Sequence, residues 1–141
     1  MRALGLDLGS VRIGVAVSDS AGTLATPVEV VQRSGDRARD HRRIADLVAE
    51  WEAEIVVVGL PLSLDGTIGP AARSALEETA ELGDTLDVPV VSYDERLTTV
   101  TAERHLREQK MTSPERRRVV DKVAAAVMLQ AWLDAGMPHG R

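Results

Sequence analysis

The chain has 141 residues, of which 44% are hydrophobic and 28% are charged, and its formal net charge is −5. This composition excludes a disordered chain and predicts one folded domain over residues 1–141. There is no cysteine, which excludes disulfides and thiolate chemistry and leaves oxygen atoms or one of three histidines as metal ligands. No apolar run approaches the roughly 20 residues that span a bilayer, and the first residues lack the pattern of a secretory signal. We therefore expect a cytoplasmic protein with no membrane partner.

The charge is unevenly distributed along the chain. Residues 46–87 hold ten acidic side chains and one base, whereas residues 33–43 carry five arginines against two aspartates. Residues 103–122 carry seven bases against four acids. Either basic stretch alone is compatible with a solvated helix surface, but together they could form a basic face that contacts nucleic acid.

The first 31 residues predict an antiparallel meander of three strands. Residues 2–8 and 11–18 are short apolar or alternating stretches joined by Gly9-Ser10, a typical hairpin turn. A second turn at Ala21-Gly22 leads into a third strand over residues 24–31.

The next elements alternate between helix and strand. Helical spacing of apolar residues predicts helices over 36–53 and 70–86, and two β-branched runs predict strands over 54–61 and 88–95. The second of these strands is too apolar for an exposed sheet edge. Strands linked by helices imply right-handed crossovers and a parallel portion of the sheet.

Two further helices complete the expected fold. Thr98 or Thr99 can cap a short helix to about residue 109, and a longer helix follows from a capping box at Thr112 to a stop at Gly136. The order predicts an α/β fold, a mixed five-stranded sheet with helices on both faces.

Three carboxylates occupy positions that otherwise predict burial. Asp7 alternates with leucines on the first strand, Glu95 follows the fifth strand, and Asp121 lies within about 60° of the apolar face of the last helix. Two of them have an ordinary explanation: residues 93–96 could be a polar loop with a local ion pair, and Asp121 could pair with Arg117 or Arg118. One shared partner explains all three better, and a hard divalent cation such as Mg²⁺ or Mn²⁺ takes oxygen ligands of this kind. Such ions support phosphodiester displacement, so the pattern predicts a nuclease site if the three converge.

Four blocks of the sequence, in order, resemble the YqgF family, also called RuvX. They are DLGSVRIGVAVSD from residue 7, VVGLPLSLDGTIGP from residue 57, YDERLTTVTAER from residue 93 and RRRVVDKVAAAVMLQAWL from residue 116. The resemblance implies an RNase H-like fold in which the first three strands are antiparallel, with Asp7, Glu95 and Asp121 as the acidic triad. It implies maturation of the 5′ end of pre-16S rRNA, with Arg12 and Arg96 as phosphate contacts. The chain departs from the family at Ser63, where asparagine is common.

Three functions stay open from the sequence. The first is a metal-dependent nuclease for structured RNA, with Arg117 and Arg118 as further contacts to nucleic acid and ribosomal precursor particles as partners. The second is a resolvase of Holliday junctions, cutting branched DNA as a homodimer rather than a monomer, and the third is a noncatalytic RNA-binding module. Two tryptophans expected in the core leave few aromatic rings for base stacking, and His41 and His105 are expected on the surface.

Overall fold

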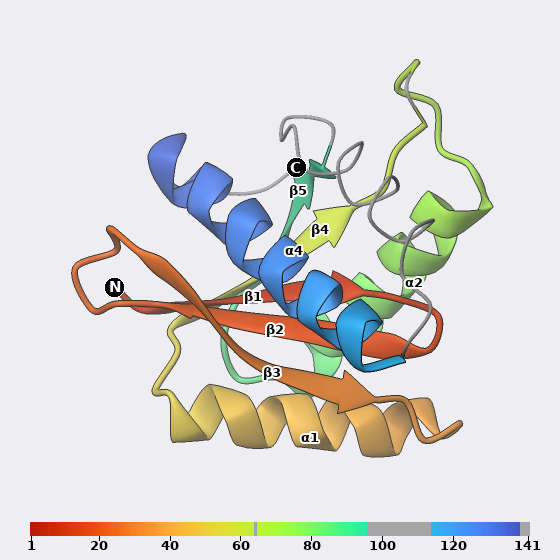
Figure 1. Cartoon of the computed structure of the whole chain (residues 1–141), viewed down its shortest axis with the longest axis horizontal. Coiled ribbons are helices and arrows are strands. Elements are labelled where there is room, and N and C mark those ends of the chain that lie inside the picture. The colour runs from red at the N-terminus through yellow and green to blue at the C-terminus, as the bar shows by residue number, and fades with distance from the viewer. Residues whose placement is uncertain (64, 96–113, 139–141) are drawn as a thin grey trace.

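A computed structural model of the chain shows one mixed sheet of five strands with helices on both faces (Figure 1). The structure describes residues 1–63, 65–95 and 114–138, with only the backbone for residues 114–122. The described elements, in chain order, are β1 (Ala3–Leu8), β2 (Arg12–Ser18), β3 (Ala25–Gln32), α1 (Arg37–Glu50), β4 (Ile55–Leu60), α2 (Pro70–Thr85), β5 (Val90–Asp94) and α4 (Pro114–Asp134).

The strand order is β3-β2-β1-β4-β5. β1 pairs antiparallel with β2, and β2 pairs antiparallel with β3, which confirms the predicted meander. β4 pairs parallel with both β1 and β5, as expected for strands connected through helices. The α/β fold with a mixed five-stranded sheet is therefore confirmed.

The turn between β1 and β2 is closed by a short hydrogen bond. The Gly9 N–H donates to the Arg12 carbonyl oxygen at 2.9 Å. A Cβ at Gly9 would lie 2.5 Å from that same oxygen, so no other residue fits there without a shift of the backbone. The second predicted turn is also present, with Gly22 at a φ of 72° that favours glycine.

Two apolar cores lie on opposite faces of the sheet. On one face Leu4, Leu6 and the alternate residues of β2 and β4 pack against α1 and α2. On the other face Ala3, Ile55 and Val57 pack against α4, which crosses the sheet in Figure 1. Trp132 of α4 is fully buried, and Trp51 is half-buried beside the first core, as expected.

The helix ends follow the expected chemistry. Asp36 caps α1 by accepting hydrogen bonds from the N–H groups of Ala38 and Arg39. Pro70 begins α2, and α4 stops before Gly136, whose φ of 87° is typical of a helix C-terminus. The expected helix to residue 109 and the capping residue Thr112 lie outside the described residues. No described helix is long and apolar enough to cross a bilayer.

One expectation about β5 is wrong. Within the described residues β5 is the last strand of the sheet, so it is an edge strand after all. Its apolar character reflects its faces rather than its position, because Val90 packs toward α1 and α2 while Val91 and Tyr93 pack toward α4. A strand that is covered on both faces needs apolar residues even when it is an edge strand.

Candidate functional site

Asp7 is a buried acid beneath helix α4. It is 6% exposed and lies on β1, opposite Gly14 of β2. Side chains alternate along a strand, so Asp7 shares a face with Ala3, which packs in the core beneath α4. The predicted burial and the predicted face of Asp7 are both confirmed.

Glu95 is the second buried acid, 8% exposed, directly after β5. Its position depends on Gly59 near the end of β4. A Cβ at Gly59 would lie 2.8 Å from Glu95 Oε1 and 3.0 Å from Glu95 Cγ, so the carboxylate rests against the bare α-carbon of this glycine. Nothing in the sequence pattern indicates that Gly59 makes space for Glu95, and this role is seen only in the structure.

The sheet register brings these two acids to the same edge and the same face. Leu6 pairs with Val58 across the parallel strands, so Asp7 and Gly59 are the next residues along each strand. Gly59 follows Val57 by two residues and therefore faces α4, as Asp7 does. The carboxylate that rests against Gly59 thus lies on the α4 face beside the strand end that carries Asp7. This edge holds the carboxyl ends of β1, β4 and β5, where open α/β sheets usually place their sites.

Asp121 belongs to α4, and its side chain lies outside the described part of the chain. Further along α4, Ala124, Ala125 and Met128 are buried against the sheet. This confirms the predicted packing face of the helix in its described part. No three acidic or histidine side chains that could hold a metal ion gather within the described residues. The structure therefore brings Asp7 and Glu95 to one edge and leaves the third predicted ligand as an expectation.

The residues present at this edge suit a hard divalent cation. Both described acids offer only carboxylate oxygens, and the chain has no cysteine that would favour a softer metal. The bare α-carbon of Gly59 supplies the space that the Glu95 carboxylate occupies at this edge.

The predicted contacts to nucleic acid are only partly described. Arg12 begins β2 and is half-buried at the same strand ends. Arg96 lies outside the described residues, as do the side chains of Arg117 and Arg118. Ser63 is exposed, and its Oγ lies 3.3 Å from where a Cβ on Gly69 would be, so the hydroxyl faces the start of α2.

The basic stretch 33–43 is largely engaged in ion pairs. Arg33 pairs with Glu78 at 2.8 Å and Arg37 with Glu81 at 2.6 Å. Arg43 pairs with Glu29 at 2.7 Å and with Glu50 at 3.1 Å. Three of the five arginines in residues 33–43 are thus paired with carboxylates of β3, α1 and α2.

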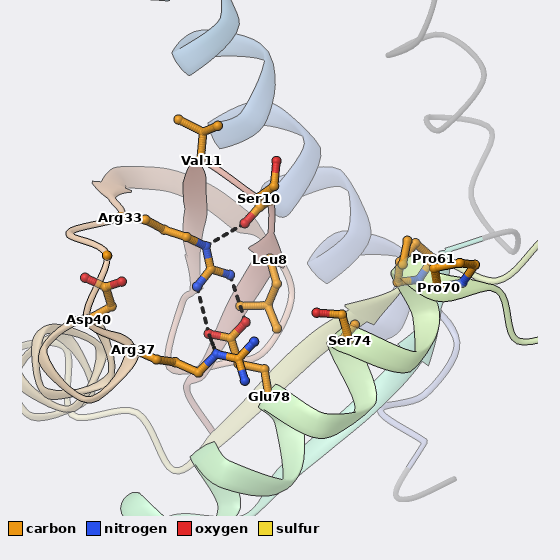
Figure 2. A pocket seen from close by; sticks show the side chains of 14 residues that line it. Leu8, Ser10, Val11, Arg33, Arg37, Asp40, Pro61, Pro70, Ser74 and Glu78 are labelled. Atoms are coloured by element: carbon orange, nitrogen blue, oxygen red, sulfur yellow. Dashed lines mark hydrogen bonds and ion pairs between the residues drawn. The ribbon is translucent and has the colours of Figure 1, made fainter.

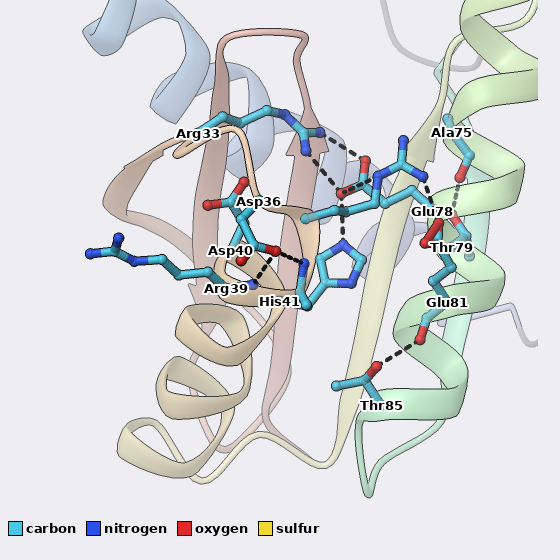
Figure 3. A network of polar contacts seen from close by, with 12 residues as sticks. Arg33, Asp36, Arg39, Asp40, His41, Ala75, Glu78, Thr79, Glu81 and Thr85 are labelled. Carbon is cyan, nitrogen blue, oxygen red and sulfur yellow. Dashed lines mark hydrogen bonds and ion pairs between the residues drawn. The ribbon is translucent and has the colours of Figure 1, made fainter.

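The expectation that His41 is a surface residue is wrong. His41 is 3% exposed, and its Nε2 lies 2.7 Å from Oε2 of Glu78 (Figure 3). Burial opposes the charge of Glu78, yet hydrogen bonds from Arg33 and His41, with the charges of Arg33 and Arg37, lower the pKa of this carboxyl. The charged neighbours of His41 in the sequence hide this contact, because its partner lies 37 residues away on another helix. His105 lies outside the described residues.

A cleft of about 810 Å³ opens between the β1–β2 turn and the first half of α2 (Figure 2). It is lined by the turn residues Leu8 to Val11, by Arg33 and Arg37, and by Pro70, Ser74 and Glu78 of α2. Leu8 alternates with Asp7, so the cleft lies on the opposite face of the sheet from the two buried acids. The β1–β2 turn therefore lines the cleft on one face of the sheet and lies next to Asp7 on the other.

Comparison with known proteins agrees with this geometry. A family model described as "RuvX: Holliday junction resolvase" matches residues 1–135. A protein of Rhodococcus opacus (strain B4) named "Putative pre-16S rRNA nuclease" is 54% identical, over 94% of this chain and 77% of that protein. A protein of the same name from Mycobacterium ulcerans (strain Agy99) is 50% identical, over 94% of this chain and 78% of that protein.

Solved structures show the same fold at low sequence identity. A structure described as "T. thermophilus RuvC in complex with Holliday junction substrate" matches with a TM-score of 0.60 at 19% identity over 96% of each chain. A second RuvC structure from Thermus thermophilus matches with a TM-score of 0.55 at 17% identity, over 97% of this chain and 98% of that chain. These matches confirm the RNase H-like fold that the resemblance implies. From the family model and the two relatives, we conclude that the chain belongs to the RuvX family.

Proposed function

We propose that this chain is a single-domain, metal-dependent nuclease that processes the 5′ end of pre-16S rRNA. Asp7, Glu95 and Asp121 would hold Mg²⁺ or Mn²⁺ at the carboxyl ends of β1, β4 and β5. The observation that carries the proposal is the position of Glu95, whose carboxylate rests against Gly59 beside the strand end of Asp7. Carboxylate oxygens of this kind are the ligands that a hard divalent cation takes.

The direction of α4 supports Asp121 as the third ligand. Gly22 lies near both Met1 and Met137, so the start of β1 is close to the end of α4. Further along β1, a Cβ at Gly5 would lie 2.9 Å from Leu129 Cβ and 3.4 Å from the Ala125 carbonyl oxygen. The strand and the helix therefore run in opposite directions. Two residues beyond Gly5, Asp7 is expected opposite the turn of α4 that contains Asp121.

The residues of this edge have distinct roles in the proposed reaction. A divalent cation bound at such a site activates water as a nucleophile and stabilises charge on the phosphate. The three carboxylates would fix the position of the cation, and Gly59 leaves room for the Glu95 carboxylate. Arg12, and by resemblance Arg96, would hold the phosphate in line with the attacking water.

The names of the relatives favour pre-rRNA as substrate, which would make ribosomal precursor particles partners and the cytoplasm the place of action. The family description favours a second candidate, the cutting of Holliday junctions in branched DNA. Symmetric cutting of a four-way junction needs two sites, so this candidate requires a homodimer, whereas cleavage of an RNA leader does not.

Cleavage of both substrates under the same Mg²⁺ and salt concentrations tests the proposal. The variants are Asp7→Asn and Asp121→Asn, and Asp46→Asn on the exposed part of α1 is the matched control. We expect the wild type and Asp46→Asn to cut the pre-16S leader, and the two site variants to lose at least about a hundredfold in rate, because each removes a charged metal ligand.

Equal cleavage rates for the wild type and Asp7→Asn would contradict the metal-dependent mechanism. Paired cuts in the DNA junction without cleavage of the RNA leader would favour the resolvase. Salt-sensitive RNA binding without turnover in any variant would favour the noncatalytic binding module.

A further inference from the structure

A single buried carboxylate connects three elements on the face opposite the proposed metal site. Glu78 of α2 is 2% exposed, and it accepts hydrogen bonds from Arg33 Nη1 at 3.0 Å and Arg33 Nη2 at 2.8 Å. Its Oε2 also lies 2.7 Å from Nε2 of the buried His41 of α1 (Figure 3). Arg33 directly follows β3, so this cluster ties β3, α1 and α2 together.

Arg33 also makes two hydrogen bonds with the turn that follows Asp7. Its Nε donates to the Gly9 carbonyl oxygen at 2.6 Å, and its backbone N–H donates to the Val11 carbonyl oxygen at 2.9 Å. Figure 2 shows the guanidinium between this turn and Glu78. The turn is also closed from within, because the Gly9 N–H donates to the Arg12 carbonyl oxygen.

We infer that Arg33 is a positioning residue, which fixes the Gly9–Val11 turn and so the placement of Asp7 and Arg12 on either side of it. The inference rests on the proposed function, since Asp7 and Arg12 matter only if they act on metal and phosphate. Asp7 is two residues before Gly9, and Arg12 accepts the hydrogen bond that closes the turn. A shift of the Gly9 carbonyl would therefore displace both Asp7 and Arg12.

The geometry requires arginine at this position. The planar guanidinium offers donors in fixed directions, so one group can hold the Glu78 carboxylate with two nitrogens and the Gly9 carbonyl with the third. The side chain is only 16% exposed, and Glu78 holds it in place before substrate arrives. A lysine at the same position would keep a positive charge beside Glu78, but its single nitrogen cannot reproduce the three-way contact.

The test compares Arg33→Lys with Arg43→Lys. Arg43 makes a similar two-nitrogen pair with Glu29, at 2.7 Å and 3.1 Å. Within the described residues, no hydrogen bond or ion pair of Arg43 reaches the β1–β2 turn. The two variants therefore lose the same kind of ion pair, and only one loses a contact with Gly9. Two quantities are measured: the exchange rate of the Gly9 amide hydrogen by NMR, and kcat and KM for cleavage of the pre-16S leader with Mg²⁺.

In the wild type the Gly9 amide should exchange as slowly as the paired amides of β1 and β2. In Arg33→Lys we expect that rate to rise at least about tenfold, and kcat to fall about tenfold or more with KM within about twofold, because small misplacements of reacting groups are costly. Arg43→Lys should change neither quantity.

Fast exchange of Gly9 in the wild type would overturn the inference without any variant. So would an Arg33→Lys protein whose Gly9 exchange and kcat match those of Arg43→Lys. A wild type that exchanges Gly9 slowly but cleaves neither RNA nor DNA contradicts the proposed function, and the exchange rate in Arg33→Lys then still decides whether Arg33 holds the turn.

Discussion

Two glycines decide how closely other atoms approach the buried acids. Gly59 accommodates the Glu95 carboxylate, and Gly5 lets α4 approach β1 two residues before Asp7. At this scale the sequence predicts the burial of Asp7 and Glu95, because a charge inside an apolar pattern is visible along the chain. It does not predict the burial of His41, because the Glu78 partner that stabilises it is distant in sequence.

Gly59→Ala should impair the site without unfolding the protein. The added Cβ would lie 2.8 Å from Glu95 Oε1 and 3.1 Å from Glu95 Cδ, so the carboxylate must move. We expect a loss of at least about tenfold in kcat, since misplacement of a metal ligand disturbs the reacting geometry. Gly83→Ala on α2 is the control, because no atom lies within 4 Å of its added Cβ. Equal cleavage rates for the two variants would show that Glu95 has no role in the site.

Apolar residues hold all three helices to the sheet, and α1 and α2 share a further polar link. α4 packs against β1 at Gly5, whereas α1 and α2 are joined to each other through Glu78 and its basic partners. The sequence predicts the order and approximate ends of these elements from apolar spacing, Pro70 and Gly136. It misjudges β5 as an inner strand, because apolar residues report covered faces and carry no information on which strands pair.

Gly5→Val should loosen the packing of α4 on β1. A Cβ at Gly5 would already lie 2.9 Å from Leu129 Cβ, and valine adds two methyl groups beyond it. Overpacking of this kind costs about 1–3 kcal/mol, so the free energy of unfolding in urea should fall by that amount. An unchanged urea midpoint would mean that α4 can move away from the sheet without cost.

The link between α1 and α2 predicts a pH dependence of stability. The pKa of Glu78 is lowered in the folded protein, since its partners outweigh the opposing effect of burial. A lowered folded pKa means that the carboxylate stabilises the fold above its unfolded pKa of about 4.3 and that this contribution is lost as the pH falls below that value. From pH 5 to pH 3 the free energy of unfolding should therefore fall more steeply for the wild type than for Glu78→Gln. Parallel curves would show that Glu78 does not contribute.

For the molecule as a whole, the position of the proposed site follows from the sheet topology rather than from the net charge. The order β3-β2-β1-β4-β5 places the carboxyl ends of three parallel strands at one edge, which brings together acids that are 88 residues apart in sequence. The net charge of −5 and the basic stretches do not predict which surface binds nucleic acid. Arg33, Arg37 and Arg43 pair with carboxylates that no local sequence pattern reveals.

The two basic stretches should therefore differ in their effect on RNA binding. Neutralising Arg117 and Arg118 to glutamine should reduce the slope of log affinity against log salt concentration by about 1.4–1.8, the value expected for two lost phosphate contacts. Neutralising Arg37 and Arg43 should leave the slope unchanged, because their charges are already paired. Binding of a labelled pre-16S leader at several salt concentrations measures both slopes, and a larger change for the Arg37 and Arg43 pair would reverse this assignment.

The central claim is that one divalent cation is shared by Asp7, Glu95 and Asp121. Binding of Mn²⁺, followed by the paramagnetic resonance signal of the free ion, tests it without any assumption about substrate. We predict that the wild type binds Mn²⁺ and that Asp7→Asn, Glu95→Gln and Asp121→Asn each weaken binding by at least about tenfold. Even the loss of a residue that only hydrogen-bonds to a metal ligand weakens metal binding by about that factor. Asp46→Asn should bind as the wild type does. Mn²⁺ binding of equal strength in the wild type and all three site variants would contradict the shared metal site.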